Sequence, residues 1–76
     1  MKNNFPSRAE VERLRNELVG KRIKFLSHGH PDPRPLEPGA EGLVEMVDDA
    51  GTLHVKWDNG RGLGLVYGVD LFEVIP

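Results

Sequence analysis

The sequence predicts a mainly β fold, a small five-stranded SH3-like barrel preceded by one short N-terminal α-helix. After the first 20 residues, short stretches of alternating apolar and polar residues are separated by turn-forming residues, which is typical of small barrels. Before them, an apolar stripe at helical spacing follows a helix-capping pattern. The 76 residues have room for a single domain, 1–76, in which we expect three parts. These are a flexible tail at 1–6, a helical segment at 7–20 and the barrel at 21–76.

The helical segment carries a start signal and a stop signal. Ser7 is followed three residues later by Glu10, so the Ser7 hydroxyl can accept the backbone N–H of residue 10. Gly20 tolerates the left-handed conformation in which helices commonly end. The apolar stripe consists of Val11, Leu14 and Leu18. A helix over 8–19 is marginal in isolation, so this stripe must pack on the barrel.

A strand and a long loop follow the helix. Ile23 and Phe25 alternate with polar neighbours in KRIKFLS, which predicts a strand. The next stretch, HGHPDPRPLEPGAEG, contains four of the six prolines and therefore predicts a loop, over 28–40. A loop of this length in so small a domain is often functional.

The rest of the chain reads as a meander of strands joined by turns. EGLVEMV, TLHVKWD, RGLGLV and LFEVIP are the strand candidates, and DDAG, NG and YGVD are the turns between them. Asn59-Gly60 is the strongest hairpin signal, since both residues tolerate positive φ. The core expected from the alternation is Ile23, Phe25, Val44, Leu53, Val55, Trp57, Leu63, Leu65, Phe72 and Val74. Trp57 shares the apolar face of its strand, so we expect a core or core-rim position.

Composition narrows the class of protein. The chain has no cysteine, which excludes disulfides and thiolate metal sites and fits a reducing cytoplasm. We find no apolar run of membrane-spanning length and no signal peptide, and we expect a soluble cytoplasmic protein without membrane contact. Residues 1–26 carry seven basic and three acidic residues, whereas residues 27–76 carry three basic and nine acidic ones. A basic front on an acidic body can steer a partner.

Metal binding and catalysis have only partial patterns in the sequence. His28, His30 and Asp32 form H-x-H-x-D, a pattern that suits a zinc ion, with His54 elsewhere as a further imidazole. Nothing in the sequence makes His54 converge on that loop, so we expect no metal and no cofactor. Catalytic patterns are also missing, because DDAG is a turn sequence and GRGLGL lacks the context of a phosphate loop. We expect a protein that is not an enzyme.

The run EPGAEGLVEMVDDAGTLHVKWDNGRGLGLVYGVDLFEVI, with FPSRAEVERLR before it, resembles a family of small bacterial and phage proteins known only as a domain of unknown function. The resemblance covers nearly the whole chain and implies the barrel fold without an established activity. GLVEMVDDAGTLHVKWDNG and YGVDLFEV more loosely resemble the SH3-like Mind bomb domains, which bind peptides.

The function expected is a non-catalytic binding or adaptor module that engages a protein or peptide partner. In SH3-like barrels the usual ligand groove lies between the long first loop and the turn before the last strand. Acidic flanks there would suit a basic or proline-containing segment. A phage-encoded modulator of host machinery would fit the resemblance. The residues expected to contact the partner are Tyr67, Trp57, His30, Asp32, Arg34, Asp58 and Asp70.

The alternative is a small barrel that binds nucleic acid weakly through its basic front. Arg8, Arg15, Arg22 and Lys24 are its candidate phosphate contacts. Three or four cations on an acidic protein would give weak, salt-sensitive binding. The sequence leaves the identity of the partner and the oligomeric state open.

Overall fold

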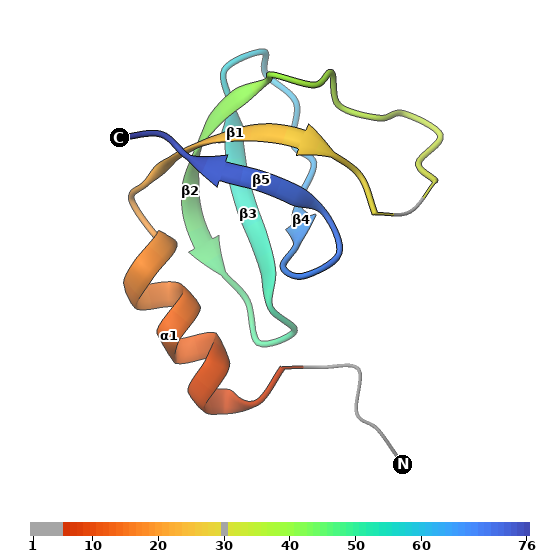
Figure 1. Ribbon diagram of the computed structural model, residues 1–76. Coiled ribbons are helices and arrows are strands. Elements are labelled where there is room, and N and C mark those ends of the chain that lie inside the picture. Colours follow the sequence, from red (N-terminus) through yellow and green to blue (C-terminus); the bar gives the residue numbers. More distant parts are fainter. Residues whose placement is uncertain (1–5, 30) are drawn as a thin grey trace.

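The computed structural model describes residues 6–29 and 31–76 and confirms a mainly β fold with one N-terminal helix (Figure 1). The predicted flexible tail at 1–6 lies, except for Pro6, outside the described residues. The elements are α1 (Arg8–Leu18), β1 (Arg22–Ser27), β2 (Glu41–Val47), β3 (Thr52–Trp57), β4 (Leu65–Val66) and β5 (Leu71–Val74). The predicted long loop therefore runs between β1 and β2.

All five strands belong to one antiparallel sheet with the order β4-β3-β2-β1-β5. The sheet bends around the core, as Figure 1 shows, but it is an open barrel. Within the described residues no ladder joins β4 to β5, so these two strands form its edges. The chain passes between them through the turn at residues 67–70.

Helix α1 lies beside the sheet and packs against β2, so that its apolar stripe joins the core. Its start is capped as predicted, because the backbone N–H of Glu10 donates to the Ser7 hydroxyl at 3.1 Å. It ends one residue earlier than predicted, at Leu18, and Gly20 follows with a φ of 88°. The N–H of Gly20 then donates to the carbonyl of Val44 at 2.8 Å, which ties the end of the helix to β2.

The core confirms the helix stripe and most of the predicted barrel residues. The buried apolar side chains are Val11, Leu14, Leu18, Ile23, Phe25, Leu36, Val44, Val47, Leu53, Val55, Trp57 and Leu65. Leu63 and Phe72 are only partly buried. Val74 is 45% exposed, so its assignment to the core was wrong: it lies at the end of an edge strand that is paired on one side only. The prediction missed Leu36, which the proline-rich loop folds inward.

The strand predicted at RGLGLV shrinks to the two residues of β4. The connection from β3 therefore spans residues 58–64 and is not a two-residue hairpin. Gly60 has a φ of 85°, whereas no residue other than glycine has positive φ in the described chain, so Asn59 does not adopt it. Within the described residues, no helix is both long and apolar enough to cross a membrane.

Candidate protein-binding site

Trp57 and Asp70, both predicted to contact a partner, are buried. The Trp57 side chain is 2% exposed and its Nε1 donates to the carbonyl of Leu63 at 2.7 Å. Asp70 is 3% exposed. The polar atoms of both side chains form contacts inside the fold, although Asp70 also contributes to the lining of an apolar groove described below.

Asp70 connects the start of the long loop to the turn before β5. One carboxylate oxygen accepts the N–H of Gly29 at 3.1 Å and lies 3.3 Å from Nδ1 of His28, and the other accepts the N–H of Val66 at 2.9 Å. Gly29 is required here, since a Cβ at this position would overlap the carbonyl oxygen of Val69. A carboxylate with several donors in a buried place stabilises local structure.

His28 has a structural position. Its Nε2 accepts the N–H of Leu36 at 3.1 Å, which assigns the ring proton to Nδ1 and directs it to Asp70. The ring also packs on Phe25, with 4.5 Å between ring centroids. His54 lies elsewhere, 2.9 Å from the carboxylate of Asp48.

His30, a predicted partner contact and a member of H-x-H-x-D, lies outside the described residues. The part of the chain that the structure describes has no group of three or more metal-ligating side chains. His28 and His54 take part in separate contacts with different aspartates. The described residues give no support to a metal site.

Two other predicted contacts, Asp32 and Arg34, lie in the middle of the long loop. Asp32 accepts the N–H of Arg34 at 2.8 Å, and Arg61 donates to the carbonyls of Arg34 and Pro35. Together with residues 60–63 they line a depression of about 520 Å³. Tyr67 lines a different depression, so the structure does not bring these residues into one groove.

Asp58 is exposed but paired. Both terminal nitrogens of Arg22 donate to its carboxylate, one of them at 3.2 Å, and Glu41 lies 3.6 Å from the same guanidinium. The hydrogen bond from Arg22, assisted by its charge, lowers the pKa of Asp58. Of the acidic flanks predicted for a basic ligand, Asp58 and Asp70 are thus engaged by the protein itself.

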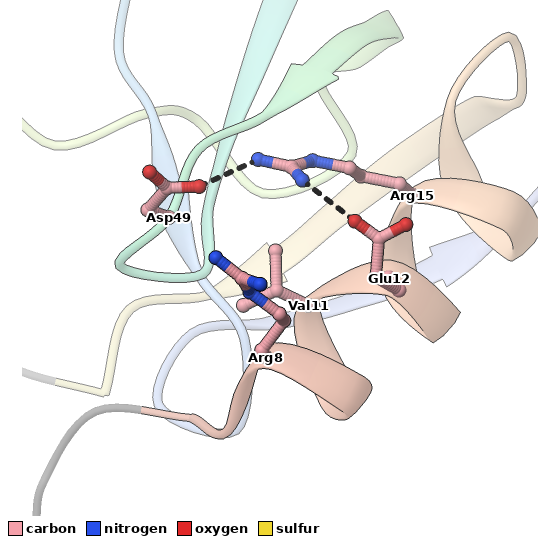
Figure 2. A pocket seen from close by; sticks show the side chains of 5 residues that line it. All are labelled: Arg8, Val11, Glu12, Arg15 and Asp49. Atoms are coloured by element: carbon pink, nitrogen blue, oxygen red, sulfur yellow. Dashed lines mark hydrogen bonds and ion pairs between the residues drawn. The ribbon is translucent and has the colours of Figure 1, made fainter.

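The four predicted nucleic-acid contacts do not form one basic surface. Arg8 and Arg15 lie on α1, facing the turn between β2 and β3 across a hollow of about 570 Å³ (Figure 2). Arg22 and Lys24 lie on β1. Lys24 approaches Glu73 at 3.9 Å, and Arg22 is paired as described above.

Arg15 joins the helix to the β2–β3 turn. Its Nε donates to the carbonyl of Val47 at 2.8 Å, and its two terminal nitrogens reach Glu12 at 3.1 Å and Asp49 at 2.9 Å. Figure 2 shows this guanidinium between the two carboxylates, with Arg8 beside it. The hydrogen bond that Arg15 donates to Asp49 is the main cause of a raised pKa at Arg15. Two cations and two carboxylates leave the hollow without net charge.

An apolar groove lies between the second half of α1 and β5, and we call it the α1–β5 groove. Its volume is about 400 Å³. Tyr67, Leu71 and Val74 are 42%, 58% and 45% exposed. The groove is lined by Glu17, Leu18, Tyr67, Gly68, Asp70, Leu71, Phe72 and Val74.

Two predicted partner contacts line this groove, the exposed Tyr67 and the buried Asp70. The Tyr67 ring meets that of Phe72 edge-on, with 6.3 Å between centroids and 62° between planes. A side-chain hydrogen bond with Tyr67 is the main cause of a raised pKa at Arg13, with the charge of Glu17 next. Tyr67 and the helix residues Glu17 and Leu18 line the same groove.

Sequence reasoning missed most of the groove. It assigned Phe72 and Val74 to the core and gave Leu71 no role. One signal was available in LFEVIP, where apolar residues occupy successive positions. Successive side chains of a strand point to opposite faces, so a strand with one buried face leaves some of these apolar side chains exposed.

A family model described as "Domain of unknown function (DUF4314)" matches residues 7–75. The match spans the helix, all five strands and the α1–β5 groove. No curated protein and no solved structure matches the chain.

Proposed function

The chain belongs to the family described as Domain of unknown function (DUF4314), and for this member we propose a non-catalytic binding module that takes an extended segment of a protein partner in the α1–β5 groove. The resemblance to small bacterial and phage proteins supports a partner from the bacterial cell, such as a component of host machinery.

The exposure of apolar side chains along the groove carries the proposal. Leu71 and Val74 lie on the same short strand, and Tyr67 precedes it, with large fractions of all three side chains accessible. Contiguous exposed apolar side chains with a polar rim are a common property of protein-interaction sites. Here the polar rim is supplied by Glu17, an exposed carboxylate that lines the groove.

The shape of the groove favours a linear peptide segment, and not a flat protein surface, as the bound partner. Phe72 and Leu18 form the floor, since both are partly or fully buried. Glu17 and Leu18 of the helix and Tyr67 of the turn line the same groove. A hollow of about 400 Å³ accommodates a few side chains of a linear segment.

A non-catalytic role is supported by how the titratable side chains are used. His28 and His54 each contact an aspartate within the fold, and Asp70 accepts backbone N–H groups. These side chains thus take part in contacts that hold the fold together, and Asp70, which also lines the groove, is 3% exposed.

The test is a selection from a displayed library of short random peptides, followed by NMR mapping of the selected peptides on the labelled protein. We expect amide shifts at Tyr67, Leu71 and Phe72. Leu71→Asp should remove the binding, because it places a charge in the apolar groove. The matched control is Met46→Asp, which changes another exposed apolar strand residue on β2. Selected peptides that map elsewhere, or no selection at all, would contradict the proposal.

A further inference from the structure

We propose, building on the binding function above, that the bound segment adds to the free edge of β5 as an antiparallel strand and places a basic side chain opposite Glu73. The partner is thus defined by its chemistry: an extended stretch in which two apolar residues flank a lysine or arginine.

The hydrogen-bonding side of β5 follows from its register with β1. The N–H of Ile75 donates to the carbonyl of Arg22 at 2.8 Å, so the backbone N–H and C=O groups of Ile75 point toward β1. Backbone groups alternate in direction along a strand. The N–H and C=O groups of Phe72 and Val74 therefore point away from β1, toward the open edge of the sheet.

The same alternation determines which side chains of an added strand would enter the α1–β5 groove. Phe72 and Val74 are the β5 partners of Phe25 and Ile23, whose side chains are buried. A partner residue opposite Phe72 or Val74 directs its side chain to the same face, into the α1–β5 groove. Two apolar residues at alternate positions of the partner fill it.

Glu73 lies between these two positions and faces outward. Its side chain is 57% exposed, and its carboxylate reaches Lys24 only at 3.9 Å. A residue directly opposite Glu73 would lie within about 5 Å at Cβ, and opposite charges at this spacing stabilise strand pairing. The charge of Glu73 therefore selects a basic residue in the partner.

Glu73 also disfavours a second copy of this chain as the occupant. When Phe72 of one copy pairs with Val74 of the other, all four outward hydrogen bonds form and Glu73 faces its own symmetry mate. Like charges directly opposite each other destabilise the pairing. Edge strands commonly use such charges to prevent self-association.

The test uses two synthetic peptides, acetyl-Thr-Val-Lys-Val-Thr-amide and its counterpart with Glu in place of Lys, titrated into the full chain. We expect the Lys peptide to bind about two- to five-fold more tightly than the Glu peptide. Glu73→Lys should reverse this order, and Glu45→Lys, the same charge change on β2, should leave it unchanged. Equal binding of both peptides, or no binding of either, would overturn strand addition.

N-methylation tests the hydrogen bonds themselves. A methyl on either Val nitrogen blocks a bond to β5 and should weaken binding about tenfold, whereas a methyl on the Lys nitrogen points away from β5 and should be tolerated. Strand addition would be overturned if the position of the methyl group made no difference to binding. It would also be overturned if sedimentation showed that the chain dimerises through β5 as its concentration rises. Neither result would remove the binding function if library peptides still map to Tyr67 and Leu71, so the two failures are distinguishable.

Discussion

The indole nitrogen of Trp57 donates a 2.7 Å hydrogen bond to the backbone carbonyl of Leu63. This bond pairs the polar atom of a nearly buried ring and ties the 58–64 connection to the end of β3. Gly42 lies opposite Trp57 on β2, and a Cβ there would come within 2.9 Å of the ring. The tryptophan is thus a packing residue whose polar edge organises a loop.

Replacing Trp57 should therefore affect stability. Trp57→Ala removes a buried aromatic side chain and is expected to lower the free energy of unfolding by about 3–5 kcal/mol. Trp57→Phe retains most of the packing and loses the hydrogen bond to Leu63, at a cost of about 1–2 kcal/mol. Urea denaturation followed by circular dichroism measures both. A loss below about 1 kcal/mol for Trp57→Ala would contradict the buried assignment.

Gly29 should tolerate no side chain. A Cβ at this position overlaps the carbonyl oxygen of Val69, so Gly29→Ala must displace the long loop from the turn before β5. We expect a loss of about 2 kcal/mol or more and faster hydrogen exchange at the amides of Val66 and Gly29. Gly62→Ala is the matched control, because nothing lies within 4 Å of the added carbon. Similar stabilities for the two variants would show that the close approach is not maintained in solution.

The sequence predicted the fold because its signals are local and agree with one another. The cap at Ser7, the stripe of Val11 and Leu14, and the alternation in β1 and β3 each depend on a few neighbouring residues, and all are found. The failures have a physical cause of another kind. β4 has only two residues, and the carbonyl of Leu63, inside the predicted strand, accepts from the Trp57 side chain, a contact that is not visible in a pattern of alternation.

The binding site was harder to predict than the fold. The sequence indicated Tyr67, but it could not show that Asp70 is turned inward to Gly29 or that Arg22 is paired with Asp58. Such contacts join positions more than 30 residues apart. The exposure of Val74 depends on which strand is at the edge of the sheet, and that follows from the assembled topology alone.

Asp48 should make stability depend on pH in the acid range. Its carboxylate contacts His54 and accepts the N–H groups of Ala50 and Thr52, and the hydrogen bond with His54 is the main cause of its lowered pKa. Because the folded pKa lies below the unfolded value of about 3.9, the stabilisation is complete above that pH. It is lost as the pH falls through the folded pKa.

His54→Ala should raise the pKa of Asp48 toward its ordinary value, and Asp48→Asn should remove this part of the acid dependence. Carboxyl-carbon NMR titration of Asp48 measures the first effect, and unfolding curves at a series of acidic pH values measure the second. An unchanged Asp48 titration in His54→Ala would show that the backbone donors alone set its pKa.

Nucleic acid should bind weakly, and only at low salt. Arg15, Arg22 and Lys24 each lie beside a carboxylate, so a phosphate must displace an existing partner to reach them. Because each phosphate contact releases counterions, the few shifts seen at low ionic strength should vanish at physiological salt. Amide NMR titrations with single- and double-stranded DNA and with RNA measure this. A variant with Asp49→Asn and Asp58→Asn removes one carboxylate partner each from Arg15 and Arg22 and should bind more tightly than the original chain. Salt-resistant shifts around Arg8, Arg15, Arg22 and Lys24 in the unaltered protein would instead identify a nucleic-acid interface.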